Sequence, residues 1–361
     1  MRYTNTKAHG KVMSKVAALA AIPMVLAYAS CSRDHLYYET SLQPNVQLNI
    51  DWSRTAFSPS HPSYDPDNPL NGVTIFAYDA ATQRLVAEFP PDADWSTPQL
   101  RLAPGTYDLV IINDSRYELP TINFSTELPF EDFVAGITPD SPGLVSSSYP
   151  GYLTSAAVRN VTVKPVEEVY EYYRPDASHN SYVMQEIDVV ERAVTKRINI
   201  KVNVNGINYC KRMLPSYMTG LSMAANLVTR LPERETVTYA FNLNNRQFKN
   251  STRTEAVLSQ TFNSFSFNED NLREGTRFDI TLNFLLVNDE TYTVTADVTP
   301  QLEKWLEEHT IDCDLDLDID ITFDVTLPAV EPVEPDHPPQ PQGGMNPDTD
   351  PWNDIKQDVI L

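Results

Sequence analysis

The strongest constraint on the fold is a strict alternation of residue type from Ile311 to Leu327. Every odd-numbered position in this run is apolar, and every even-numbered position is Asp or Thr. Successive side chains of a β-strand point to opposite faces, so a period of two predicts a strand with one buried face and excludes a helix. At ~3.3 Å per residue the run would reach roughly 55 Å, so we expect it to bend or to serve two sheets in succession. We interpret it as an antiparallel strand of a β-sandwich.

The even positions of this run raise the question of a calcium site. Calcium loops turn sharply around a Gly and end in a bidentate Glu, and no Gly interrupts this run. Carboxylates on one face of a strand also lie roughly 6–7 Å apart, too far for neighbours alone to hold one ion. We therefore interpret these carboxylates as a solvated face and predict neither a metal site nor a cofactor. The residues concerned are Asp312, Asp314, Asp316, Asp318 and Asp320.

Other segments carry weaker patterns of secondary structure. Gln301–His309 places Leu302, Trp305 and Leu306 at helical spacing and predicts a short helix. Leu214–Leu227 has little β-branching and several Ala, Met and Ser residues, so we expect the only sizeable helix of the second half there. Residues 114–149 show no pattern that assigns an element. Predicted strands lie at 46–52, 73–78, within 100–113, 151–164, 197–204, 262–267, 277–287 and 291–298.

The N-terminus has the pattern of an export signal. Three lysines precede an apolar segment from Val16 to Tyr28, and Ala29 and Ser30 lead into Cys31. The apolar segment is shorter than the roughly 20 residues that span a bilayer. A cysteine directly after small residues resembles the bacterial lipobox, although Tyr28 stands where an aliphatic residue is usual. We predict that Cys31 is acylated and anchors the protein; the alternative is an ordinary cleavable secretory signal.

The charge of the chain excludes one class of partner. The formal net charge is −22, and the first 30 residues carry four basic and no acidic side chains, so the remainder is at about −26. Nucleic acid is bound through clustered Lys and Arg, so we predict no nucleic-acid partner. Anionic headgroups would also repel this chain, so membrane attachment is expected through lipid rather than a basic patch.

Catalytic motifs are missing from the sequence. There is no GxSxG, HExxH, P-loop or GxGxxG pattern, and 11 glycines in the whole chain leave no Gly-rich phosphate loop. None of the histidines lies in a Ser-His-Asp or Cys-His context. We therefore predict that the protein is not an enzyme. Clusters of tyrosine, such as Tyr149 with Tyr152, suit either a protein or sugar surface or the packing between domains.

Two further cysteines and the C-terminal tail complete the candidate sites. Cys210 and Cys313 either form a disulfide or remain two separately buried thiols. Residues 329–351 contain seven prolines and predict an extended linker. The apolar residues after it predict a short strand that folds back on its own chain or docks on a partner's sheet edge. These residues are Trp352, Val359, Ile360 and Leu361.

Several short motifs together resemble a known family. They are the lipobox Cys31, the segment SRDHLYYE after it, Asp51-Trp52, the PGTYDLVIIN segment from Pro104 and the GGMNPDTDPWND tail from Gly343. In these motifs the chain is similar to lipoproteins of Bacteroidales, which in turn look like fimbrillin-type fimbrial subunits and their anchor lipoproteins. The resemblance implies two tandem transthyretin-like, Greek-key β-sandwich domains, attachment to the outer membrane and a role in fimbria assembly, anchoring or adhesion.

Sequence and resemblance together predict an all-β envelope lipoprotein. It is expected to be a fimbria-associated structural, anchoring or adhesion subunit. Its N-terminal lipid would hold it at the outer membrane, on the cell surface, and its expected partners are other fimbrial or envelope proteins. The alternative is a surface glycan-binding lipoprotein of a polysaccharide-uptake system. The expected parts are a signal peptide at 1–30, a lipidated tether at 31–45, β-sandwiches at 46–193 and 194–328, a proline-rich linker at 329–351 and a strand at 352–361.

Overall fold

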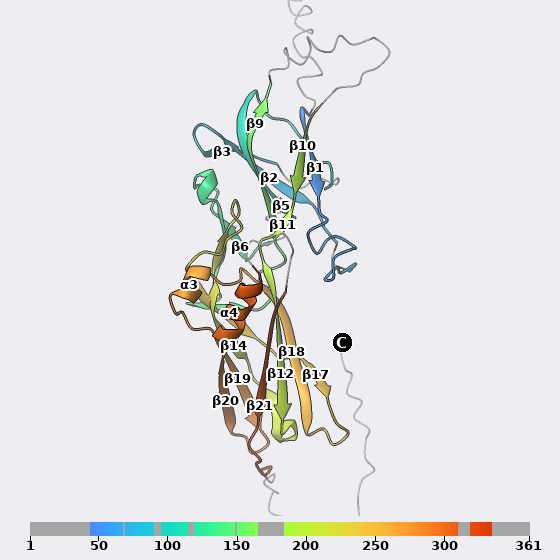
Figure 1. Cartoon of the computed structure of the whole chain (residues 1–361), viewed down its shortest axis with the longest axis vertical. Helices are drawn as coiled ribbons and strands as arrows, with labels where there is room; N and C mark the ends of the chain where they lie inside the picture. Colours follow the sequence, from blue (N-terminus) through green and yellow to red (C-terminus); the bar gives the residue numbers. More distant parts are fainter. Residues whose placement is uncertain are drawn as a thin grey trace, which may run out of the picture.

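The protein is an elongated molecule built almost entirely of β-strands (Figure 1). The computed structural model describes residues 44–67, 69–89, 95–114, 119–148, 150–164, 184–309 and 318–333. Two β-sandwiches follow one another along the long axis, and short 3-10 turns and helices lie between and beside them. The all-β sandwich class predicted from the sequence is confirmed.

The first sandwich packs a three-stranded sheet, called sheet I, against a five-stranded sheet, called sheet II. Alternate residues of the two facing sheets share one buried cluster, with Leu48 and Ile50 from sheet I and Ile75, Leu109 and Ile111 from sheet II. Sheet I has the order β10 (Gln185–Val190), β1 (Val46–Asp51), β4 (Gln99–Leu100). Sheet II has the order β11 (Arg192–Ala193), β9 (Thr154–Val163), β5 (Gly105–Asn113), β2 (Val73–Asp79), β3 (Arg84–Phe89).

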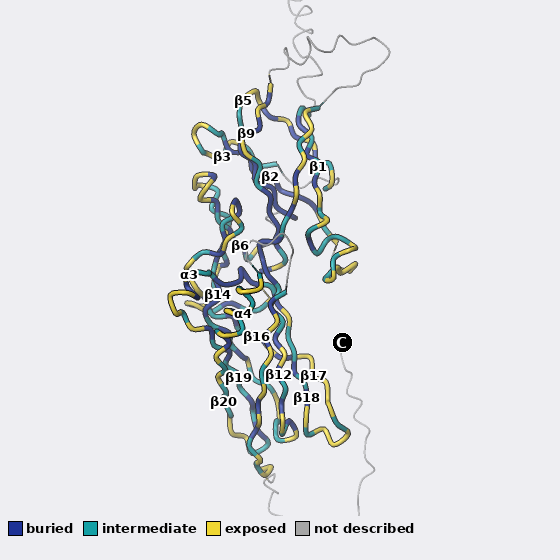
Figure 2. The backbone as a smooth tube through the Cα atoms, viewed as in Figure 1, coloured by how far each residue is buried: buried dark blue, intermediate teal, exposed yellow. Residues whose placement is uncertain are grey.

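The central strands of sheet II, β2 and β5, are buried on both faces. The residues of β2 and β5 that point away from sheet I, such as Phe76, Tyr78 and Val110, lie in a second buried cluster. This explains why residues 73–78 read as a continuous run of buried positions rather than an alternation (Figure 2). A 3-10 turn at Phe130–Asp132 and a three-stranded sheet, called sheet III, cover this face. Sheet III has the order β15 (Ala224–Asn226), β7 (Val134–Ile137), β6 (Ile122–Phe124).

The second sandwich consists of sheets IV and V, whose facing residues continue the same buried cluster. Helix α4 (Thr299–Glu308) lies beside it through buried Leu302, and α3 (Glu269–Arg273) is the other helix of the described residues. Sheet IV has the order β17 (Asn245–Phe248), β18 (Glu255–Ser264), β12 (Lys196–Asn205), β21 (Ile319–Thr326). Sheet V has the order β13 (Cys210–Met213), β19 (Asp279–Leu286), β14 (Ser216–Ser222), β16 (Thr236–Phe241), β8 (Leu144–Ser146), and β20 (Thr291–Asp297) pairs with β19.

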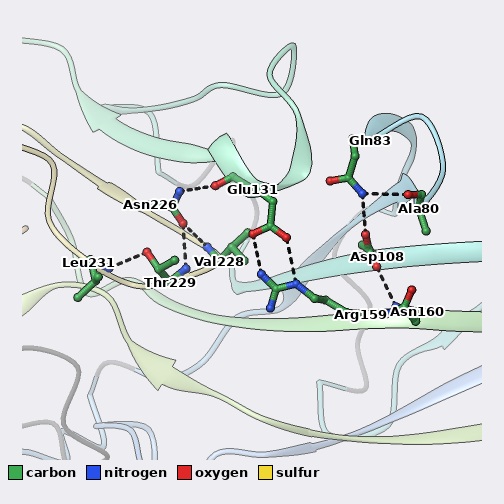
Figure 3. A network of polar contacts seen from close by, with 10 residues as sticks. All are labelled: Ala80, Gln83, Asp108, Glu131, Arg159, Asn160, Asn226, Val228, Thr229 and Leu231. Carbon is green, nitrogen blue, oxygen red and sulfur yellow. Dashed lines mark hydrogen bonds and ion pairs between the residues drawn. The ribbon is translucent and has the colours of Figure 1, made fainter.

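The two halves of the chain exchange strands. The early strand β8 pairs in parallel with β16 of the second sandwich, and the late strand β15 pairs with β7 beside the first. Figure 3 shows part of the junction, where the Asn226 side chain donates to the carbonyl of Glu131 (2.7 Å) and accepts from two amides of its own turn. The Glu131 carboxylate is paired in turn with Arg159 of β9 (2.6 Å). The predicted division at Ala193, between β11 and β12, stays a prediction, because strands of each half complete sheets of the other.

Two predictions of secondary structure are wrong. Residues 214–227 form β14 and β15 rather than a helix, because β14 pairs with β16 and β19 in sheet V and β15 pairs with β7 in sheet III. Pairing with distant strands thus overrides the weak local preference for a helix. The strand within 311–327 is β21, and it pairs with β12 in parallel, not antiparallel. Alternation fixes which side chains are buried, but it carries no information on the direction of the neighbouring strand. The predicted helix at 301–309 is confirmed as part of α4.

Candidate interaction surface

The outer face of sheet IV is a polar surface. Odd-numbered residues of β12 and β18 point outward, as do the even-numbered residues of β21, while their neighbours fill the core. Amide, hydroxyl and carboxylate groups therefore stand in rows across three neighbouring strands. Such a face suits contact with polar partners better than burial against an apolar surface.

The aspartates of β21 are held by asparagines of β12. The Asn199 amide donates to Asp318 Oδ2 (2.9 Å) and to Asp320 Oδ1 (3.1 Å), and the Asn203 amide donates to Asp324 Oδ1 (2.7 Å). Asp312, Asp314 and Asp316 lie outside the described residues. Within the described part of the chain, no group of three or more His, Cys, Asp or Glu side chains is placed to hold a metal ion.

A cleft of about 310 Å³ opens where the first sandwich meets the outer face of sheet IV. The first sandwich contributes residues that include Phe57, Asp65 and Tyr152, and sheet IV contributes the rest of the lining. The sheet IV residues include Arg197 of β12 and Asn263 of β18, which are direct cross-strand partners, together with Thr261. Its volume is at the lower end of the range for small-molecule sites, roughly 300–1,000 Å³.

The wall of the cleft on the first sandwich is built from consecutive turns. Four amides from Thr55 to Tyr64 each donate to the carbonyl three residues earlier, at 2.9–3.1 Å, which folds this segment compactly. The Phe57 ring packs edge-on between Trp52 and Tyr152, with ring centroids 5.7 Å and 5.3 Å apart. The Tyr152 hydroxyl accepts a hydrogen bond from the Ala56 amide (2.9 Å), so this tyrosine supports the wall.

The polar groups of the cleft include both donors and acceptors. The Arg197 side chain is 24% exposed, and its one ionic neighbour among the described residues is Asp318, at 3.9 Å from Nε to Oδ1. Asp65 accepts one hydrogen bond from the Asp67 amide and presents its remaining lone pairs outward. The cleft thus combines an aromatic wall with a guanidinium, a carboxylate, an amide and a hydroxyl. These groups can donate hydrogen bonds to, and accept them from, a ligand rich in hydroxyl groups.

Most residues singled out in the sequence fall elsewhere. The lipid anchor, the disulfide and the terminal strand stay predictions, because residues on which they depend lie outside the described part of the chain. These residues are Cys31, Cys313, Trp352, Val359, Ile360 and Leu361. Cys210 is half-buried at the start of β13, and burial raises the pKa of its thiol. No helix in the described ranges combines the length and apolarity needed to cross a bilayer. Sequence reasoning did not bring Phe57, Asp65 and Arg197 together, since no local pattern signals that they meet.

Comparison with known proteins identifies the fold. No family model and no curated protein matches the chain. Among solved structures, the chain is similar to one described as a candidate adhesin from Bacteroides thetaiotaomicron, with a TM-score of 0.51. The two sequences are 13% identical, and the match covers 78% of this chain and 92% of that chain. A candidate adhesin from Bacteroides ovatus matches with 16% identity, 82% and 94% coverage and a TM-score of 0.48. The fimbrial anchor protein Mfa2 from Porphyromonas gingivalis matches with 12% identity, 79% and 91% coverage and a TM-score of 0.45.

The first of these matches shows that the chain shares the fold of the Bacteroides thetaiotaomicron structure over most of both chains. At 13% identity, a likeness of this kind identifies the fold and leaves activity and partners open. The β-sandwich fold implied by the resemblance noted in the sequence is therefore one that this chain shares with a solved structure described as a candidate adhesin.

Proposed function

We propose that this protein is a cell-envelope lipoprotein that serves as a fimbria-associated structural, anchoring or adhesion subunit. The observation that carries the proposal is the fold shared with the candidate adhesin from Bacteroides thetaiotaomicron over 78% of this chain. The export signal ending in Cys31 supports a lipid-anchored location at the outer membrane, on the cell surface. The proposed role is structural or binding, and the described lining of the cleft brings one carboxylate and one guanidinium together from opposite walls.

Partner subunits would engage exposed edges of the sheets. Among the described strands, β17 and β20 each pair on one side only, and all four residues of β17 are exposed. An edge strand presents unpaired backbone groups to which a second chain can add a strand. The segment containing Trp352 and residues 359–361 is the proposed added strand, supplied to another subunit or to its own chain.

The anchoring proposal predicts a specific change in cell fractionation. In cells carrying the wild-type chain, we expect the protein in the outer-membrane fraction together with co-purifying envelope proteins. Cys31→Ala should release it from membranes, whereas truncation after Pro351 should leave it in the membrane fraction and reduce the co-purifying proteins. Membrane association that survives Cys31→Ala would contradict lipid anchoring, and unchanged co-purification after truncation would contradict the role of the tail.

A second candidate function is binding of a neutral glycan in the cleft. Sugar hydroxyls donate and accept hydrogen bonds, which matches the mixed set of Asp65, Arg197 and Asn263 beside the Phe57 ring. A net charge of −22, together with Asp65 and Asp318 at the cleft, disfavours an anionic sugar. The polar lining also disfavours an apolar ligand, since its groups would lose their water without gaining partners.

Loss of the guanidinium should weaken such binding. We expect Arg197→Ala to raise the Kd for a neutral oligosaccharide about 10-fold or more, because a charged hydrogen-bond donor is removed. Titration calorimetry with hits from a glycan array measures this effect. The control is Arg273→Ala, since Arg273 is 69% exposed on α3 and away from the cleft. An array without a neutral binder, or equal affinity in both variants, would contradict the assignment.

A further inference from the structure

One extended segment runs through both sandwiches. From Gln185 to Asn205 the chain forms β10, β11 and β12 in succession, in sheets I, II and IV, and it leaves strand geometry only at Glu191 and at residues 194–195. In Figure 1 this segment follows the long axis from the first sandwich down to the far end of the second. We call residues 185–205 the spine.

Both terminal strands of the described chain pair with the spine in parallel. The first, β1, is in register with β10 from Val46↔Gln185 to Asp51↔Val190. The last, β21, is in register with β12 from Ile198↔Ile319 to Asn205↔Thr326. Because both strands run in the direction of the spine, the chain enters β1 at one end of the molecule and leaves β21 at the other (Figure 1).

This arrangement determines how tension acts on the chain. Pulling the two ends apart draws β1 along its own axis past β10, and draws β21 along its own axis past β12. The ladder hydrogen bonds lie across the strands and are evenly spaced in a parallel pair, so all of them resist the sliding together. Peeling a strand from one end would instead break them one after another.

Side chains oppose the same sliding motion. Each strand carries apolar side chains that are fully buried or nearly so, Val46 and Leu48 in β1 and Ile319 and Ile321 in β21. Sliding either strand would move these side chains through a close-packed core. A shift of one residue would also turn each strand's apolar row toward the wrong face.

Hydrogen-bonded Asn–Asp pairs cross both joints at matched positions. In the first joint, the Asn49 amide donates to Asp188 Oδ1 (3.1 Å), and these two residues are direct register partners. In the second joint, Asn199 with Asp320 and Asn203 with Asp324 are also register partners and are bonded at 3.1 and 2.7 Å. The alternating aspartates of β21 thus fasten the last strand to the spine.

We propose that the protein is a tension-bearing link, in which force between its two ends passes from β1 to the spine and from the spine to β21 through two parallel joints loaded in shear. The biological use of this property rests on the proposed anchoring at the envelope. The mechanical property itself belongs to the folded chain and is measured on purified protein, so either proposal can fail without the other.

Single-molecule stretching of the full chain tests the proposal through the direction of pulling. In one geometry the handles are at the N- and C-termini. In the other they are at Ser251, an exposed residue in the turn between β17 and β18, and at the C-terminus, so that β21 is peeled from its end. Forced unfolding follows the unfolding rate, so at one loading rate we expect a first rupture force about twofold or more higher in the first geometry. Equal or lower force in the first geometry would overturn the proposal.

A pair of double variants separates the joints from general stability. Asn49→Ala with Asn203→Ala removes one Asn–Asp pair from each joint, and we expect the end-to-end rupture force to fall. Asn250→Ala with Asn283→Ala removes side-chain hydrogen bonds from a turn and from sheet V, outside both joints. We expect this control to lower the melting temperature while the rupture force is maintained. An equal loss of force in both would show that the asparagine pairs have no special role.

Discussion

Replacing Gly220 by alanine lowers the free energy of unfolding by about 2–5 kcal/mol, a large share of the stability of an ordinary domain. Gly220 has a φ of +90°, where an L-residue costs roughly 1–2 kcal/mol. A Cβ at this position would lie 2.4 Å from Cδ1 and 2.7 Å from Cε1 of Phe278. Phe278 is fully buried and packs edge-on against Phe267, so displacing its ring adds roughly 1–3 kcal/mol of overpacking.

A matched glycine isolates the two contributions. Gly275 has a φ of +88°, but nothing lies within 4 Å of a Cβ built on it. Gly275→Ala should therefore carry only the backbone cost, about 1–2 kcal/mol. Urea denaturation of both variants measures the difference. Equal costs at the two positions would show that the Phe278 ring moves aside freely.

Gly220 also helps to explain why the sequence of residues 214–227 does not reveal a strand. Ala, Met and Ser in this segment favour a helix weakly and show no period of two. In the structure, the β14–β16 register shifts between Met218 and Leu221, and Gly220 lies within that irregularity. A strand that breaks its own alternation to let the ring of Phe278 approach has no local signature, because Phe278 lies some 60 residues away, just before β19.

The aspartate-rich run shows how far alternation alone can be used. Its period correctly assigned Ile319, Ile321 and Val325 to the core and Asp320 to the exposed face. Two properties of the same strand depend on β12, about 120 residues earlier: its parallel direction and the asparagines that bind its carboxylates. Pairing of distant strands is not encoded in the period of either one.

The candidate site was less predictable than the fold. Asp65 lies in a proline-rich segment, residues 58–72, that is typical of a loop, and Phe57 comes just before it. Arg197 is only the first residue of a predicted strand. They meet because the turns after β1 place one wall of the cleft against the outer face of sheet IV. Aromatic clusters did draw attention to Tyr152, but the structure gives it a supporting contact with Ala56.

The second large effect is a loss of stability as the pH rises, caused by Glu191. This side chain lies in the spine between β10 and β11, is fully buried, and has no hydrogen-bond partner for either carboxyl oxygen among the described residues. The nearby Thr154 hydroxyl donates instead to Asn113 (3.3 Å). Burial raises the pKa of Glu191 to about 8, an increase that the positive charge of Arg230 only partly opposes.

The direction of the effect follows from proton binding. The folded protein keeps this proton up to about pH 8, whereas the unfolded chain releases it near the ordinary pKa of 4.5. Between these values the unfolded state binds fewer protons, so stability falls as the pH rises, by about 1.4 kcal/mol per unit. The loss contributed by Glu191 is therefore about 3 kcal/mol at pH 7 and about 5 kcal/mol above pH 8.

Glu191→Gln tests this linkage, because glutamine has the shape of the protonated acid and no ionisable group. Relative to the wild type, we expect the variant to gain little near pH 4.5 and about 3 kcal/mol at pH 7 in urea denaturation. Glu186→Gln, at an exposed position of the neighbouring strand β10, is the control and should show no such pH-dependent gain. A gain that is the same at every pH would mean that the amide improves packing, and that the buried carboxyl is not the source of the pH dependence.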